Sequence, residues 1–103
     1  MYLVVLITCP DEEEGKKIAD FLLKERLAAC VNLIPNLTSF FWWSGKRHES
    51  EEVLLMVKTK KRVLRELIKK VKETHQYENP EIIALPVIGG SKDYMKWIED
   101  ETR

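Results

Sequence analysis

The stretch Phe40-Phe41-Trp42-Trp43-Ser44-Gly45-Lys46 decides how this chain folds. The chain has three Phe and three Trp residues, and two of each stand in this run. Because Ser44-Gly45-Lys46 is a turn signal, the aromatic run is predicted to be one arm of a β-hairpin, with the apolar residues 53–57 in the returning strand. Successive side chains of a strand point to opposite faces, so one small core cannot cover all four rings.

The four aromatic rings therefore need cover from two sides. Alternation places Phe40 and Trp42 on one face of the strand and Phe41 and Trp43 on the other. An exposed patch of large aromatic side chains commonly marks a protein interface. We expect these four residues to form a subunit interface; the alternative is a strand sandwiched between two layers of its own domain.

The N-terminal half of the chain predicts a strand, a helix and a long bent strand. Residues 3–7 form a continuous apolar run that is typical of a strand buried on both faces. Asp11, followed three residues later by a glutamate, resembles a capping box and predicts a helix over about residues 11–26. Residues 28–34 predict a second strand, which Pro35-Asn36 bends before it continues into the aromatic arm.

The C-terminal half of the chain follows a similar order. Thr59 is predicted to cap a second helix, whose apolar side chains recur at helical spacing. Residues 82–88 predict a fourth strand, and Pro86 within it indicates an edge position or a bulge. Ser91 is expected to cap a short third helix.

The element order β-α-β-β-α-β-α defines the predicted fold. Two successive βαβ halves are typical of an α+β protein with the ferredoxin-like split βαβ sandwich, in which helices cover one face of an antiparallel sheet. We expect residues 1–103 to form a single domain. The open face of the sheet needs cover, and the apolar strands indicate that other subunits provide it.

Composition argues against several classes of function. The 17 basic and 17 acidic residues give a formal net charge of +0, so there is no basic excess for nucleic acid. The apolar run near the N-terminus is too short to span a membrane, and no secretory signal is visible. We therefore expect a cytoplasmic protein that binds neither nucleic acid nor membrane.

No catalytic constellation is apparent in the sequence. A phosphate-binding loop needs glycines and free backbone N–H groups, whereas the loop Thr8-Cys9-Pro10-Asp11-Glu12 offers proline and carboxylates. The two cysteines form no C-x-x-C pair, and Cys30, inside the second predicted strand, is interpreted as a small core residue. We therefore expect a protein that is not an enzyme.

Two regions offer candidate ligands. His75, at the end of the second helix, is followed by Gln76-Tyr77-Glu78-Asn79-Pro80-Glu81, which is interpreted either as a ligand-binding rim or as a helix C-cap with turn residues. Cys9, expected at the exposed mouth of the first loop, is either a soft metal ligand or an incidental thiol. His48 is expected to be a solvated surface residue.

These segments together resemble the CutA family, the divalent-cation tolerance proteins. The resemblance covers nearly the whole chain and combines blocks that would not be specific one by one. The blocks are Leu22-Leu23-Lys24-Glu25-Arg26-Leu27-Ala28-Ala29-Cys30-Val31-Asn32, Ser39-Phe40-Phe41-Trp42-Trp43-Ser44-Gly45-Lys46, Glu52, Val57-Lys58-Thr59, His75-Gln76-Tyr77-Glu78-Asn79-Pro80-Glu81-Ile82 and Tyr94-Met95-Lys96-Trp97.

The resemblance implies a tight homotrimer in which the long hairpin reaches onto neighbouring subunits. It also implies a non-enzymatic role in tolerance of divalent metals, with copper(II) as the favoured ion and no required cofactor. The family's histidine carries over onto His75, and we predict Cys9 and Glu81 as further metal ligands. Some relatives carry a second histidine where this chain has Thr74, and some carry a thiol where it has Ile7.

Two other hypotheses remain open at this point. One is a signalling or scaffold trimer, related in architecture to the PII regulators, that binds a small metabolite or a protein partner in the same cleft. The other is a stable trimer whose role lies only in its interaction partners.

Overall fold

A computed structural model describes residues 1–103, which form four strands, three α-helices and one short 3-10 helix. Along the chain they are β1 (Tyr2–Cys9), α1 (Glu12–Lys24), β2 (Cys30–Trp43), β3 (Lys46–Lys60), the 3-10 helix (Lys61–Val63), α2 (Leu64–Thr74), β4 (Ile82–Val87) and α3 (Lys92–Glu101). The predicted order of strands and helices is confirmed.

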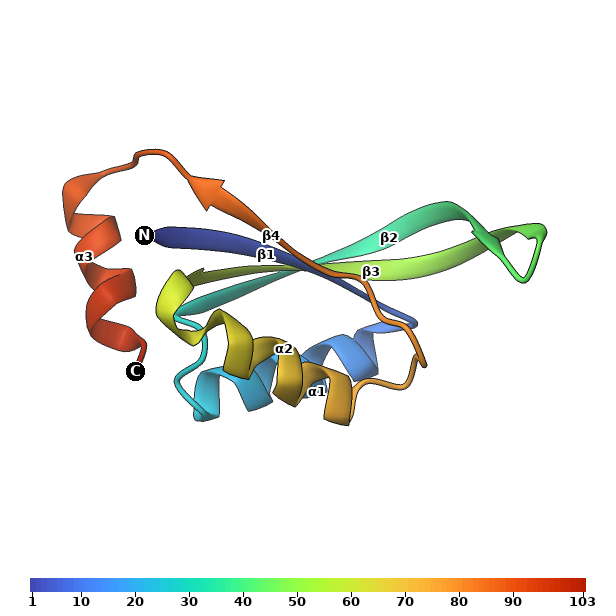
Figure 1. Cartoon of the computed structure of the whole chain (residues 1–103), viewed down its shortest axis with the longest axis horizontal. Coiled ribbons are helices and arrows are strands. Elements are labelled where there is room, and N and C mark those ends of the chain that lie inside the picture. Colours follow the sequence, from blue (N-terminus) through green and yellow to red (C-terminus); the bar gives the residue numbers. More distant parts are fainter.

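The four strands form one sheet in the order β2-β3-β1-β4, and every neighbouring pair is antiparallel. Helices α1 and α2 lie side by side along one face, while α3 lies at one end of the sheet, beside both chain termini (Figure 1). This is the predicted ferredoxin-like α+β sandwich. Strand β4 is an edge strand, as Pro86 indicated.

The hydrophobic core lies between the sheet and the helices α1 and α2. Alternate residues of β1 and β3, such as Val5 and Leu55, are fully buried and meet Ile18 of α1 and Leu67 of α2. Val4, one position from Val5, is only half-buried, so the prediction that β1 is buried on both faces is wrong for the single chain. A sheet covered by helices on one face alone produces this alternation.

The opposite face of the sheet is largely apolar, apart from residues such as Asn32 and Lys58, and has no layer of helices over it. The strand register places Val4 beside Leu85 and Ile34 beside Leu54 on this face. Ile34, Ile83 and Leu85 are 41%, 51% and 47% exposed. A contiguous apolar surface of this kind is unusual for an isolated soluble chain, which is why the sequence predicted that other subunits cover it.

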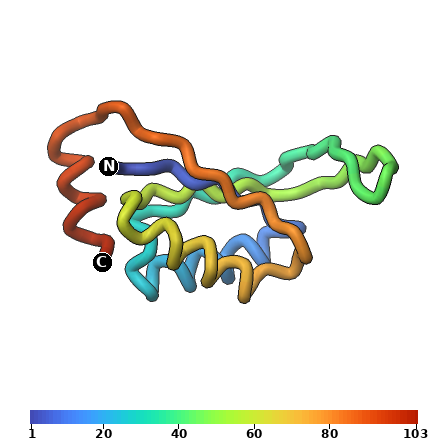
Figure 2. Tube along the Cα trace, in the orientation of Figure 1, coloured from blue at the N-terminus to red at the C-terminus, as the bar shows by residue number.

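Strands β2 and β3 form a long hairpin that extends well beyond the helices (Figure 2). Both turn residues have positive φ, 52° at Ser44 and 74° at Gly45, the combination that a two-residue type I′ turn requires. The predicted interruption of β2 is confirmed as a register shift between Ile34 and Leu37, with Asn36 in the left-handed region.

The returning arm of the hairpin is longer than predicted. It begins at Lys46 rather than at Val53, because the polar residues 46–52 pair one by one with the aromatic arm from Trp43 to Leu37. Residues 46–49 are all exposed in the single chain, so this part of the strand shows no apolar alternation.

The ends of the helices agree only in part with the predicted caps. Asp11 caps α1, because its Oδ1 accepts the backbone N–H of Glu14 at 2.8 Å. Ser91 likewise caps α3. Thr59 does not cap α2: it lies inside β3, its hydroxyl donates to the carbonyl oxygen of Leu27 at 2.7 Å, and a 3-10 turn precedes the helix.

Candidate binding cleft

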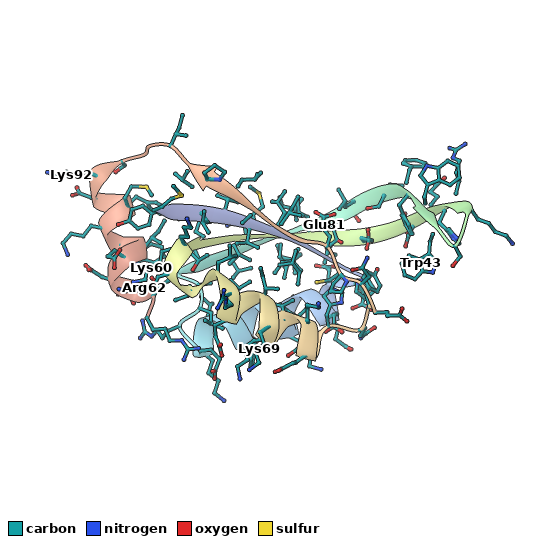
Figure 3. The ribbon with its side chains drawn as sticks, in the orientation of Figure 1. Trp43, Lys60, Arg62, Lys69, Glu81 and Lys92 are labelled. Carbon is teal, nitrogen blue, oxygen red and sulfur yellow. The ribbon has the colours of Figure 1, made fainter.

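A cleft lies where the hairpin leaves the sheet and the loop between α2 and β4 passes beside it. Its volume is about 860 Å³, and its lining combines the aromatic arm 40–43, Glu52 of β3 and the loop residues 76–81. Figure 3 labels Glu81, which immediately precedes β4, and Trp43, the last residue of β2 in the hairpin. The predicted interface residues and the predicted ligand loop therefore border one cavity.

His75 ends helix α2 and is buried, with 8% of its surface exposed. Its Nδ1 accepts the backbone N–H of Tyr77 at 3.0 Å, so that nitrogen carries no proton. Its Nε2 therefore donates to the carbonyl oxygen of Thr8 in β1, at 2.8 Å. Both ring nitrogens are engaged within the chain, and a metal could bind Nδ1 only by displacing the Tyr77 N–H.

Tyr77 connects this histidine to a buried carboxylate. Its ring packs against the imidazole of His75, with ring centroids 4.8 Å apart, and its hydroxyl donates to Oε2 of Glu52 at 2.8 Å. Burial, followed by the hydrogen bond and charge of Glu52, raises the pKa of the Tyr77 phenol. The phenol thus remains a protonated donor, and Glu52 is held at the cleft with 8% of its surface exposed.

Glu52 was not predicted as a site residue. The sequence marks Glu52 in two ways: it is one of the blocks of the family resemblance, and it stands at the junction between the polar and apolar halves of β3, immediately before the core residue Val53. The partner that holds it, Tyr77, is 25 positions away along the chain, so the pattern around Glu52 does not reveal the pair.

Glu81, which the sequence analysis predicts as a metal ligand, is one of the residues that line the cleft. Partial burial raises its pKa, and the negative charge of Glu52 adds to the effect. The two carboxylates therefore repel each other across the cleft. Nowhere in the single chain do three His, Cys, Asp or Glu side chains come close enough together to hold a metal ion.

Cys9 does not lie at an exposed loop mouth, which corrects the sequence-based expectation. It is the last residue of β1, has no exposed surface and belongs to the core that faces the helices. Burial, followed by the charges of Glu14, Glu52 and Asp11, raises the pKa of its thiol to about 12. The residue is absent from the cleft lining, so the structure does not bring it together with Glu81.

Of the two residues Cys30 and His48, only Cys30 differs from its predicted environment. Cys30 was expected in the buried middle of a strand, but it is the first residue of β2 and is half-buried, with Sγ 3.9 Å from Oδ1 of Asn32. His48 is exposed as expected, and its ring also stacks on Phe41 at a centroid distance of 5.6 Å.

Comparisons with known proteins identify close relatives over almost the whole chain. Residues 3–101 match the family model described as CutA1 divalent ion tolerance protein. The chain is 48% identical over 99 residues to the divalent-cation tolerance protein CutA of Thermus thermophilus, covering 96% of both chains. It is 44% identical over 101 residues to Protein CutA 1, chloroplastic, of Oryza sativa, covering 98% of this chain and 57% of the relative.

Solved structures give the same result. The divalent cation tolerance protein of Thermus thermophilus superimposes with a TM-score of 0.98 at 47% identity, covering 100% of both chains. The Archaeoglobus fulgidus structure, described as the periplasmic divalent cation tolerance protein CutA, has a TM-score of 0.95 at 40% identity and covers 98% of each chain. The chain spans a little over half the length of the chloroplastic relatives of rice and Arabidopsis thaliana.

These names correct the expected location. Relatives described as chloroplastic and as periplasmic show that this domain occurs in more than one compartment, so a cytoplasmic assignment is not supported. The expectation relied on the lack of a visible secretory signal. That observation does not determine the compartment of a domain whose relatives are described as chloroplastic and as periplasmic. Separately, none of the helices is long and apolar enough to cross a membrane.

Proposed function

Because the chain belongs to the CutA1 divalent ion tolerance family, we propose that it is a non-enzymatic homotrimer that binds a divalent cation in the cleft beside its aromatic hairpin. The proposal has three parts: the cation, its ligands and the assembly that completes the site.

The observation that carries the cation proposal is the pair of carboxylates at Glu52 and Glu81. Glu52 is almost fully buried, and partial burial together with the charge of Glu52 raises the pKa of Glu81, so ionised Glu81 is disfavoured without a counter-charge. A divalent cation between them would remove the repulsion and accept their oxygens as ligands. We therefore propose Glu52 as a metal ligand in addition to the predicted ligand Glu81.

Copper(II) is the ion that we propose first, since it accepts both carboxylate and imidazole ligands. His75 would join through Nδ1 once the N–H of Tyr77 moves away, and this requires the 75–81 loop to shift. Cys9 would join only if the core opened at the end of β1. Ranked by how little the structure must change for each to bind the ion, the proposed ligands are Glu52 and Glu81 first, then His75, then Cys9.

The trimer proposal is supported by the two unpartnered surfaces of the chain. One is the open apolar face of the sheet, and the other is the hairpin arm, where Phe40 and Trp42 are 66% and 71% exposed. Neighbouring subunits that cover these surfaces would also border the cleft. They could supply the ligands that two carboxylates alone do not, since divalent ions bind four or more.

Calorimetric titration of chelator-stripped protein with copper(II), zinc and cobalt tests the cation proposal. We expect stoichiometric copper binding that weakens by about tenfold or more in Glu52→Gln and Glu81→Gln, because each loses a charged ligand. Glu49→Gln is the matched control, since Glu49 is an exposed carboxylate of the same strand that does not line the cleft. His75→Ala shows whether the imidazole takes part.

Weak binding that is equal for all three ions and unchanged by these substitutions would refute the cation proposal. The second candidate function, a PII-like signalling or scaffold trimer, would then be preferred. The size of the cleft favours that candidate, because about 860 Å³ is far more than a single ion occupies. Sedimentation velocity of the unmodified protein tests the trimer separately.

A further inference from the structure

We propose that the cleft binds an organic cation, an alkylammonium or guanidinium compound, with its charge at Glu52 and Glu81 and its hydrocarbon part against the aromatic arm. This inference concerns the same cleft as the divalent cation but does not depend on metal binding.

The size of the cleft is the first argument. Its volume of about 860 Å³ lies within the range of about 300–1,000 Å³ that is usual for small-molecule sites. One water molecule corresponds to about 30 Å³ of liquid, so a hydrated metal ion would leave most of this space unused. The cleft has room for a ligand with several carbon atoms besides its charged group.

The chemistry of the lining is the second argument. Three carboxylates border the cleft, at Glu52, Glu78 and Glu81, whereas no Lys or Arg side chain is among its lining residues. The same walls carry aromatic rings, including Phe41 and Trp43. Aromatic faces attract ammonium and guanidinium groups and also cover alkyl chains, so rings and carboxylates together match an organic cation.

Glu52 gives the cleft an anchor that is positioned before any ligand arrives. Its Oε2 accepts the Tyr77 hydroxyl, and Tyr77 is in turn fixed by its backbone N–H to His75. Its Oε1 has no hydrogen-bond partner in the chain. This oxygen is not completely buried, although the residue as a whole is only 8% exposed. A charged N–H donor would satisfy this oxygen at little cost in ordering the protein.

The distribution of ligand atoms favours an organic cation over a metal as the molecule that uses the whole cleft. Metals need lone pairs from several converging groups, and no three His, Cys, Asp or Glu side chains converge in the chain. The aromatic walls provide no such lone pairs. An alkylammonium ion needs one or two carboxylates and an apolar surface, which this cleft contains.

The test uses full-length, chelator-stripped protein and two probes, putrescine for alkylammonium and agmatine for guanidinium. Butanediol, the neutral diol with the chain length of putrescine, is the matched ligand control. Binding is followed by calorimetry and by tryptophan fluorescence at constant ionic strength. We expect saturable binding of at least one cationic probe, no saturable binding of butanediol, and a Kd about tenfold or more higher in Glu52→Gln and Glu81→Gln.

Glu49→Gln is again the matched protein control and is expected to bind the probes as the unmodified protein does. Circular dichroism establishes that each variant is folded before it is titrated. The proposal is overturned if neither probe binds, if butanediol binds equally well, or if Glu52→Gln and Glu81→Gln keep full affinity. Copper(II) is titrated in a parallel sample, so a failure to bind the metal is distinguished from a failure to bind the organic cations.

Discussion

The hydroxyl of Tyr77 donates a 2.8 Å hydrogen bond to Oε2 of Glu52, which ties the loop after α2 to the base of the hairpin. The bond fixes a carboxylate that is only 8% exposed and determines which of its oxygens stays free. It is the last link in a chain of contacts that begins at the Thr8 carbonyl and passes through His75. Three segments that are distant in sequence meet in this way at the cleft.

Replacing Tyr77 with phenylalanine should destabilise the protein. Tyr77→Phe keeps the ring against His75 but removes the donor to Glu52, leaving a buried carboxylate oxygen unpaired. We expect the free energy of unfolding to fall by about 1–3 kcal/mol. Thermal unfolding at a fixed protein concentration measures this, and an unchanged transition would mean that water replaces the phenol without cost.

Removal of the His75 imidazole should have a larger effect than removal of the other histidine. His75→Ala leaves the Thr8 carbonyl and the Tyr77 N–H without their partner, at a cost of about 1–3 kcal/mol for each group that stays buried. His48→Ala is the control, because His48 is exposed and contacts only the ring of Phe41 among aromatic neighbours. Equal melting temperatures for the two variants would contradict a structural role for His75.

Loss of the hairpin tryptophans should weaken assembly. In the single chain Trp42 is 71% exposed and Trp43 46% exposed, and the proposed trimer buries them further. Truncation of a buried aromatic residue to alanine typically costs about 3–5 kcal/mol, so the double variant Trp42→Ala, Trp43→Ala should dissociate at micromolar concentration. Sedimentation velocity reports the oligomeric state.

Trp97→Ala controls for the general loss of an indole ring. Trp97 is 41% exposed and lies on α3, away from the hairpin, so its removal should leave the sedimentation coefficient unchanged. A double hairpin variant that still sediments as a full trimer would show that Trp42 and Trp43 do not hold the subunits together.

The sequence predicted those features that depend on local spacing. The turn at Ser44-Gly45, the interruption at Pro35-Asn36 and the cap at Asp11 each need only a few neighbouring residues, and all three occur in the structure. The order of strands and helices follows from hydrophobic periodicity, which is likewise a local property. The fold class could therefore be predicted without knowledge of any long-range contact.

The features that the sequence missed depend on partners far along the chain. The polar residues 46–52 become a strand because the opposite arm pairs with them. Cys9 is buried because helices pack over the end of β1. The residue that follows it, Pro10, indicated a loop and therefore suggested an exposed thiol. The link from His75 to Thr8 spans 67 positions. Such contacts arise from tertiary packing, which local patterns do not record.

The buried thiol of Cys9 should make the protein less stable at alkaline pH. Its pKa is raised from an ordinary 9.0 to about 12, so the unfolded chain releases this proton at lower pH than the folded chain does. The contribution of the protonated Cys9 thiol to the free energy of unfolding is fully present below pH 9.0, and it is lost as the pH rises towards about 12. The expected slope is about 1.4 kcal/mol for each pH unit in that interval.

Unfolding measured across this pH range in Cys9→Ala, compared with the unmodified protein, isolates the contribution. The variant should be less stable near neutral pH, because it leaves a small cavity, and its stability should decline less steeply above pH 9.0. Thiol reagents give a second measurement: Cys30 should react in the folded protein, whereas Cys9 should react only after unfolding. Parallel alkaline slopes for both proteins would contradict the burial argument.

The carboxylate of Glu14 provides the opposite kind of test, because its removal should stabilise the protein. Glu14 is 2% exposed, and neither of its oxygens has a hydrogen-bond partner, since it does not complete the capping box with Asp11. Glu14→Met keeps a similar length and removes the unpaired polar atoms, so we expect the free energy of unfolding to rise by about 1–3 kcal/mol. The exposed neighbour Glu13, changed to Met, is the control and should be nearly neutral. A loss of stability in Glu14→Met would mean that the carboxylate has a partner outside the single chain. Repeating the melt with a chelator and with added divalent cation would then show whether that partner is a metal ion.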